Sequence, residues 1–257
     1  MMQSYATRLA YLTLLLIFFQ SGLLAQITCD DPLILLADDL DGYTEGDVSD
    51  QADHWTIWPG ATVGGIVSAE QSESGSQSLK IDGMIPEQDV LLLLGDSTQG
   101  HYLLRFDMYV PAGKGAYFNV SHEAPTESEV FIAFEAIFDG DGTGRIFLFD
   151  NEFITTSFDY PEDDWFEVYF WADIDSDQAR INIDEYTRRA WTFSDGFTNG
   201  PVNYPSSGLN SINFYPIDTS FQFYVDNIDF WQIPAAETGK YCYTAVPATV
   251  GTNSVLS

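Results

Sequence analysis

Carboxyl and imidazole side chains are the first candidates for chemistry in this sequence. A retaining glycoside hydrolase needs two carboxyl groups about 5–5.5 Å apart, and alternate residues of a β-strand share a face. Glu129 and Glu135 have the same parity, although six positions separate them, and His122 lies near the end of the preceding apolar segment. These three residues are the candidates for a glycoside hydrolase or a polysaccharide lyase. A single histidine at a strand end is more often structural, so the sequence favours a non-catalytic function.

Aromatic residues on the polar side of alternating segments indicate a binding surface instead. In the segments 105–110, 115–122 and 165–173, apolar residues alternate with a second row of polar and aromatic residues. This period of two places one row in the core and the other on an outer or concave face. Aromatic rings stack on the C–H faces of sugars, while amides and carboxylates bind hydroxyl groups. The alternative is that the aromatic residues form a second apolar layer. We predict ligand contacts from Tyr109, Tyr117, Asn119, Tyr169 and Trp171.

Two acidic segments have spacings that could wrap a cation. Residues 139–144 (DGDGTG) alternate acid and glycine, and residues 173–184 place acids at the ligand spacing of an EF-hand loop. Asp-Gly pairs favour the positive φ of hairpin turns. Gln178 occupies the position at which an EF-hand loop requires glycine. We therefore predict a hairpin turn in each segment.

The elements that position these residues are short strands. Helical signals are almost absent after residue 25, and runs of β-branched and aromatic residues alternate with Gly, Pro, Asn and Asp clusters. This pattern predicts an all-β fold, a sandwich or a barrel of antiparallel strands. The expected strands are 65–69, 78–82, 89–94, 101–110, 115–122, 130–138, 145–149, 165–174, 179–184, 190–193, 211–216 and 221–231.

The N-terminus has the features of a secretory signal peptide. Arg8 precedes the apolar run 9–19, and the small Ala25 is a plausible cleavage point. The run is too short for a comfortable membrane span, and no second run of spanning length follows. We expect a signal peptide at 1–25, one domain at 26–234 and a polar tail at 235–257. The protein is then secreted or at the cell surface, with no membrane span in the mature chain.

The two cysteines lie near opposite ends of the mature chain. In an exported protein, Cys29 and Cys242 are expected to form a disulfide. A bridge over so long a loop contributes about 5 kcal/mol in the chain-entropy description. The alternative is two free thiols.

The charge of the chain restricts its partners. Nine Lys and Arg residues stand against 39 Asp and Glu residues, giving a formal net charge of −30. Such a chain repels phosphate backbones, so nucleic acid is not an expected partner. Excess carboxylates attract hard cations such as Ca²⁺, although they also serve simply to keep a surface soluble.

The order of four motifs resembles that of a known superfamily. Residues 38–46 (DDLDGYTEG) followed by 54–58 (HWTIW) are similar to the opening of secreted bacterial jelly-roll modules. Residues 74–80 (SGSQSLK), 106–119 (FDMYVPAGKGAYFN) and 224–229 (YVDNID) are similar to the later strands of those modules. Together they resemble the concanavalin A-like lectin/glucanase superfamily and its carbohydrate-binding modules.

This resemblance implies a jelly-roll sandwich of two antiparallel sheets and a structural Ca²⁺. The matching metal ligands are Asp41, Gly75 and Asp226, although Leu40 replaces the usual Phe and Asp41 is shorter than the usual Glu. The leading hypothesis is a secreted, non-catalytic module that binds extracellular polysaccharide on its concave sheet. A hydrolase or lyase on the same scaffold, and a structural or adhesive cell-surface module, are the alternatives.

Overall fold

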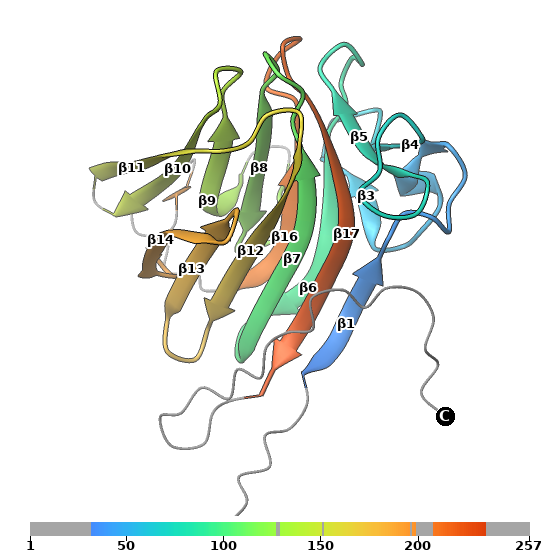
Figure 1. Ribbon diagram of the computed structural model, residues 1–257. Helices are drawn as coiled ribbons and strands as arrows, with labels where there is room; N and C mark the ends of the chain where they lie inside the picture. Colours follow the sequence, from blue (N-terminus) through green and yellow to red (C-terminus); the bar gives the residue numbers. More distant parts are fainter. Residues whose placement is uncertain (1–31, 127–128, 151, 196, 199–207, 235–257) are drawn as a thin grey trace, which may run out of the picture. The chain divides into compact units, whose positions relative to one another are not determined.

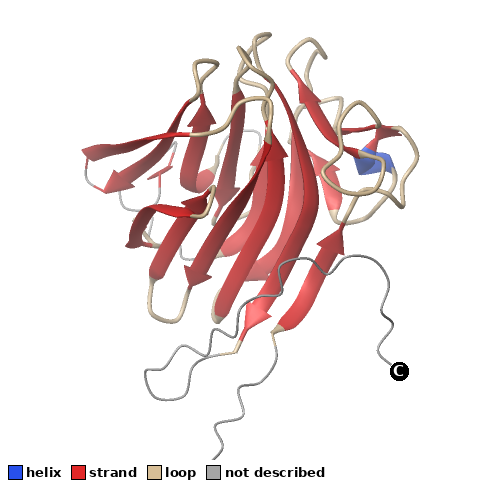
Figure 2. Cartoon of the chain, in the orientation of Figure 1, coloured by secondary structure: helices blue, strands red, loops and turns tan. Residues whose placement is uncertain are grey.

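A computed structural model of the chain describes residues 32–234, apart from 127–128, 151, 196 and 199–207. The described part is built almost wholly of β-strands, as Figure 2 shows, with one short 3₁₀ turn at Val48–Asp50. No helix in this part is long and apolar enough to cross a membrane. The predicted signal peptide, both cysteines and the tail from residue 235 lie outside the described residues.

One sheet contains nine antiparallel strands, including the first and the last (Figure 1). β1 (Leu33–Asp38) pairs antiparallel with β17 (Gln222–Ile233). Leu33 at the start of β1 therefore lies opposite Gln232 near the end of β17. The remaining order is β14 (Tyr186–Thr192), β13 (Gln178–Ile183), β12 (Trp165–Asp173), β7 (His101–Tyr109), β17 (Gln222–Ile233), β5 (Ser78–Asp82), β4 (Ile66–Ser68) and β2 (Gly46–Asp47).

The second sheet contains eight strands and packs against the first. A short strand, β15 (Phe197–Thr198), extends it beside β9. The main order is β11 (Glu152–Asp159), β10 (Thr143–Asp150), β9 (Phe131–Phe138), β8 (Ala116–Ser121), β16 (Leu209–Phe214), β6 (Val90–Ser97) and β3 (Trp55–Ile57). The predicted all-β, two-sheet antiparallel sandwich is therefore confirmed.

Aromatic side chains fill the space between the sheets. Phe106 of β7 meets Phe118 of β8 edge-to-face, with ring centroids 5.3 Å apart. Phe134 of β9 lies 4.9 Å from Phe170 of β12 in the same core. All four are fully or almost fully buried, and burial of each stabilises the fold by about 1.5–3 kcal/mol. These contacts identify the inner face of each sheet, so their sequence neighbours point outward.

Both acidic segments form hairpin turns, as predicted. Between β9 and β10 the backbone N–H of Asp139 donates to the carbonyl of Thr143 at 2.8 Å, and Gly142 has a φ of +79°. Between β12 and β13 the N–H of Ser176 donates to Asp173 Oδ1 at 2.8 Å, and Asp177 adopts a φ of 55°. Asp177 then accepts a hydrogen bond from the Ser194 hydroxyl at 2.7 Å. In the second turn the carboxylates of Asp173 and Asp177 thus accept hydrogen bonds from Ser176 and Ser194.

Candidate functional site

The five predicted contact residues do not share one surface. Tyr109 lies on β7 and Tyr169 and Trp171 on β12, all in the nine-stranded sheet, whereas Tyr117 and Asn119 lie on β8 in the eight-stranded sheet. Each of the five side chains points away from the core, so the predicted inward and outward faces of each strand agree with the structure. The two groups nevertheless face away from each other across the core. The structure therefore does not bring all five residues onto one surface.

A continuous row of polar side chains crosses four strands of the eight-stranded sheet. Strand register sets Asn213 of β16 opposite Asn119 of β8, and Asn119 opposite Glu135 of β9. Asn119 Nδ2 donates to Asn213 Oδ1 and to the Tyr117 hydroxyl, both at 3.0 Å. Tyr117 in turn donates to Glu135 Oε1 at 2.7 Å, and Asn213 Nδ2 donates to Asp89 Oδ1 just before β6. We call these five residues the polar row.

Burial changes the acidity of both carboxyl groups in the polar row. Desolvation raises the pKa of Asp89 to about 7, against an opposing hydrogen bond from Asn213. Desolvation also raises the pKa of Glu135, opposed by the hydrogen bond from Tyr117. The Tyr117 hydroxyl has a raised pKa because it is desolvated and lies beside Glu135. A buried carboxyl with a raised pKa is typical of functional sites as well as of structural networks.

One buried hydroxyl group next to the polar row has no hydrogen-bond partner. Ser211 of β16 stands opposite Ser121 of β8 and is fully buried, and its Oγ is unpaired. Ser121 makes only a long contact of 3.5 Å, to Asn119 Oδ1. Buried polar groups are nearly always paired in folded proteins, so an unpaired hydroxyl beside a polar network marks a place for a ligand group or an ordered water.

Aromatic side chains border the polar row. Tyr215 follows β16 and is 36% exposed, with its ring 6.2 Å from that of Tyr117 in an edge-on arrangement. Phe147 of β10 is half-buried and lies opposite Glu135 in the register. The Arg145 guanidinium stacks on the Phe147 ring at 5.4 Å. The face therefore combines a polar floor with aromatic edges, the usual make-up of a small-molecule site.

The structure does not bring the three predicted catalytic residues together. Glu129 is exposed in the loop before β9, where its N–H donates to the Thr126 hydroxyl oxygen at 3.0 Å. His122 is buried with its ring 4.6 Å from the core residue Phe193, and Nδ1 contacts the Gly208 carbonyl at 2.9 Å. Burial lowers the His122 pKa to about 4. His122 thus packs on the inner side of the sheet, whereas Glu135 points outward.

The two carboxyl groups of the polar row are also poorly placed for hydrolysis. Asp89 precedes β6 and Glu135 lies on β9, so β16 and β8 stand between them. Three strand spacings of about 4.8 Å separate the groups by roughly 14 Å. The carboxyl pairs of inverting glycosidases are about 6.5–9.5 Å apart, and those of retaining enzymes are closer.

The outer face of the nine-stranded sheet carries a charged network around Arg105. Its Nη2 lies 2.8 Å from Glu167 Oε1 and 3.0 Å from Asp107 Oδ1, and the Tyr169 hydroxyl donates to the same Glu167 oxygen at 3.0 Å. Desolvation raises the Asp107 pKa to about 6, although Arg105 opposes this. A hollow of about 200 Å³ adjoins the network, lined by Glu73, Asp107, Trp165, Phe166, Glu167, Asp184 and Glu185.

The three predicted calcium ligands meet at the turn 73–76. Asp226 is fully buried and accepts hydrogen bonds from the N–H groups of Glu73 at 2.8 Å and Ser74 at 3.1 Å. Asp41 accepts the N–H of Ser76 at 2.7 Å, and a Cβ on Gly75 would collide with the Asp41 carboxylate. The Asp226 carboxylate and Asp41 Oδ1 thus accept hydrogen bonds from the turn, whereas no hydrogen bond within the described residues reaches Asp41 Oδ2. Within the described residues, no group of three or more His, Cys, Asp and Glu has the arrangement of a metal site. The calcium site stays a prediction.

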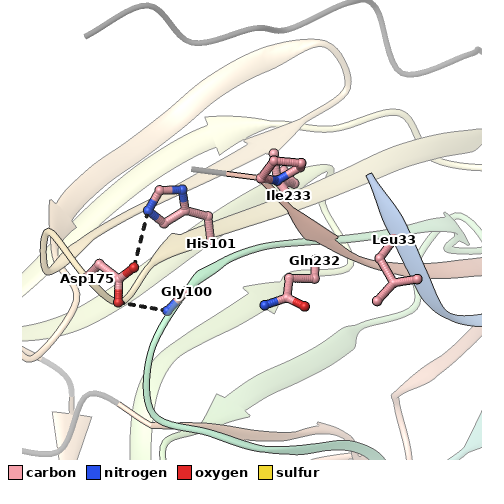
Figure 3. A pocket seen from close by; sticks show the side chains of 7 residues that line it. Leu33, Gly100, His101, Asp175, Gln232 and Ile233 are labelled. Atoms are coloured by element: carbon pink, nitrogen blue, oxygen red, sulfur yellow. Dashed lines mark hydrogen bonds and ion pairs between the residues drawn. The ribbon is translucent and has the colours of Figure 1, made fainter. Parts of the chain in front are cut away.

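A second hollow, of about 300 Å³, lies where β17 ends (Figure 3). The His101 ring points toward Asp175, with Nε2 3.7 Å from Asp175 Oδ2 and 3.2 Å from Asp173 Oδ1. The Gly100 N–H donates to Asp175 Oδ1 at 2.8 Å. These contacts bind the β12–β13 turn to the start of β7. The lining residues are Leu33, Gly100, His101, Asp175, Gln232, Ile233 and Pro234.

Sequence reasoning missed Asp89, Asn213, Ser211 and Tyr215. A signal for two of them was present, because Ser211 and Asn213 alternate with the buried Ile212 and Phe214. The sequence offered no comparable signal for Asp89, which stands at the edge of an apolar run. Its place in the polar row depends on the pairing of β6 with β16.

Comparisons with known proteins identify the fold. No protein-family model matches the chain, and no curated protein matches it. Among solved structures, a sialidase aligns with a TM-score of 0.51 and 13% identity, over 76% of this chain and 18% of the sialidase. SCLam, a non-specific endo-β-1,3(4)-glucanase from family GH16, aligns with a TM-score of 0.51 and 11% identity, over 80% of this chain and 92% of SCLam.

A further structure, domain 4 of the GH43 extracellular arabinanase AbnA from Geobacillus stearothermophilus in complex with arabinotriose, aligns with a TM-score of 0.49 and 13% identity. The alignment covers 79% of this chain and 94% of that domain. The chain thus spans nearly all of the glucanase and a small part of the sialidase. The fold is the concanavalin A-like jelly roll, as the sequence motifs predicted.

Proposed function

We propose that this protein is a secreted, non-catalytic module that binds polysaccharide along the outer face of its eight-stranded sheet. The observation that carries the proposal is the polar row, which crosses four strands and has aromatic side chains at its borders. Asn119, Asn213 and Tyr117 are buried at the centre of the row, whereas its two end carboxyl groups are half-buried. Hydroxyl groups of a sugar chain would therefore bond to Asp89 and Glu135, while Tyr215 and Phe147 stack on the rings. The fold shared with an endo-glucanase supports the proposal.

The wide spacing of the carboxyl groups favours binding over hydrolysis. A sugar chain bound across the strands would meet Asp89 and Glu135 at different rings, because about 14 Å separates them. The adhesive alternative predicts no affinity for isolated glycans. A measurement of binding to isolated glycans therefore distinguishes the adhesive alternative from the proposed function.

The test is affinity electrophoresis of the mature protein in gels that contain neutral polysaccharides, followed by calorimetry on any polymer that retards it. The double variant Tyr215→Ala, Phe147→Ala should bind at least about tenfold more weakly, which corresponds to about 1.4 kcal/mol. The matched control, Tyr169→Ala with Trp171→Ala, removes two aromatic residues from the opposite sheet and should leave binding unchanged.

Two results would contradict the proposal. Loss of binding in the Tyr169, Trp171 variant alone would move the site to the nine-stranded sheet, where those residues lie. The release of new reducing ends from a bound polymer would make the protein an enzyme. Unchanged circular dichroism of both variants establishes that neither effect arises from unfolding.

A further inference from the structure

The polar row uses its hydrogen-bond donors internally. The Asn119 amide donates to Tyr117 and Asn213. The Asn213 amide donates to Asp89 and to the Val90 carbonyl, the latter at 3.0 Å. The Tyr117 hydroxyl donates to Glu135. Amide and phenol donors of the row are therefore committed before any ligand arrives.

The capacity left over consists mainly of acceptors. Hydrogen bonds within the described residues reach only Oδ1 of Asp89 and Oε1 of Glu135, so each carboxyl keeps a second oxygen. Both side chains are half-buried and lie at the two ends of the row. Between them the Ser211 hydroxyl is buried and unpaired, and it can accept as well as donate. The free oxygens of the two ionised carboxyl groups only accept, so they favour a ligand that brings donors.

Positive charge on this face is limited to one residue. Arg145 is the single Lys or Arg on the described strands of the eight-stranded sheet. Its Nη2 forms an ion pair with Asp139 at 2.7 Å, and its guanidinium stacks on Phe147, although its buried Nε has no partner. No ion pair within the described residues neutralises Asp89 or Glu135. An anionic ligand would meet two carboxyl groups and one cation that is already paired.

We infer that this face selects neutral, hydroxyl-rich polysaccharides and rejects those that carry carboxylate or sulfate groups. The inference rests on the proposed function and specifies its substrate class. A sugar hydroxyl donates to a free carboxyl oxygen, whereas a carboxylate or sulfate offers acceptors alone and adds like charge. Rejection by unfavourable pairing is a common source of binding specificity.

Polymers that share a backbone and differ in charge test the inference. Hydroxyethyl cellulose is compared with carboxymethyl cellulose, and a sulfated galactan with its desulfated form, each by affinity electrophoresis of the mature protein. Buffers are held at about pH 8.5, above the pKa of about 7 that burial gives Asp89, so that this carboxyl is ionised and its free oxygen only accepts. They contain about 0.15 M salt, where the screening length of about 8 Å suppresses long-range repulsion by the acidic chain. In at least one pair the neutral member should bind at least about tenfold more tightly, equivalent to about 1.4 kcal/mol.

A charge-matched pair of variants separates the polar row from the net charge of the protein. Asp89→Asn with Glu135→Gln removes both carboxyl charges of the row and adds amide donors. This variant should lose most of the discrimination against the charged polymers. Asp184→Asn with Glu185→Gln removes the same number of charges beside the other sheet, and it should keep the discrimination.

The outcomes distinguish the inference from the proposed function. Equal or tighter binding of the charged members by the unmodified protein overturns the inference while leaving polysaccharide binding in place. Equal loss of discrimination in both variants also overturns it, because net charge would then be the cause. Absence of retardation by every polymer overturns the proposed function, and the inference with it.

Discussion

The raised pKa of Asp89 predicts a loss of stability as the pH rises from about 4 to about 7. In the unfolded chain this carboxyl ionises near its ordinary pKa of 3.8, whereas burial in the fold raises the pKa to about 7. Between these two values the folded state holds a proton that the unfolded state has released. The free energy of unfolding from this group is therefore highest below about pH 4 and falls as the pH rises through 7.

The size of the effect follows from the two pKa values. Linkage between 3.8 in the unfolded chain and about 7 in the fold gives a loss of about 2–3 kcal/mol between pH 5 and pH 8. Asp89→Asn keeps an acceptor for the Asn213 amide and stays neutral at every pH. The free energy of unfolding of this variant should therefore lack this part of the decline with pH. Plotted against pH, it should rise above that of the unmodified protein as the pH increases.

The assay is urea unfolding of both proteins at several pH values between 5 and 8.5, in one buffer series of constant ionic strength. Asp107 and Asp226 also have pKa values raised to about 6 by desolvation, so both proteins should lose some stability with increasing pH. The difference between the two curves isolates Asp89. Parallel curves over the whole range would refute the argument, because Asp89 would then be ionised in the fold at no cost.

Four further predictions concern the polar row, the turn 73–76, a bound metal and the covalent state of the exported chain. Asn213→Ala should lower the free energy of unfolding by about 2–4 kcal/mol in urea titration, because it removes the side-chain partner of Asp89 and one of the two acceptors of the Asn119 amide; a loss below about 1 kcal/mol would show that water replaces the side chain. Asp226→Ala should cost about 2–4 kcal/mol, since it frees the N–H groups of the turn 73–76. EDTA should leave the melting temperature of the unmodified protein unchanged, because backbone donors already bond to Asp41 and Asp226; a decrease would support the predicted calcium site. Mass spectrometry of the exported protein should find Gln26 at the N-terminus and Cys29 joined to Cys242; a free thiol at either position would contradict the bridge.

Local patterns in the sequence were sufficient to predict most of the strands and their outward-facing sides, but not β1, β2, β3, β11 and β15, which were absent from the expected ranges. In β12 the residues Phe166, Val168 and Phe170 are buried and alternate with the half-buried Glu167 and Tyr169. This period is a property of the extended backbone and needs no knowledge of neighbouring strands. The turns were predictable for the same reason, because Asp-Gly sequences fix a local backbone conformation.

Which of the two sheets a strand joins could not be predicted from the alternation of apolar and polar residues. β7 and β8 are consecutive and separated by a short loop, which reads as a hairpin in the sequence. The structure instead pairs β7 with β12 and β17, and β8 with β9 and β16. Tyr109 and Tyr117 therefore point to opposite sides of the sandwich, although each lies on the outer side of its strand.

The polar row was beyond local prediction because its members are distant in sequence. Asn213 follows Asp89 by 124 positions and Asn119 by 94, and it meets both only because β16 enters the sheet between β6 and β8. No single strand of the row contains a recognisable motif. The same dependence makes the site sensitive to register, since a slip of β16 by one residue would turn Asn213 and Ser211 into the core and Ile212 outward. The core contacts of Phe214 with Phe106 and Phe118 oppose that slip. The aromatic packing between the sheets therefore keeps the amide of Asn213 within reach of both Asp89 and Asn119.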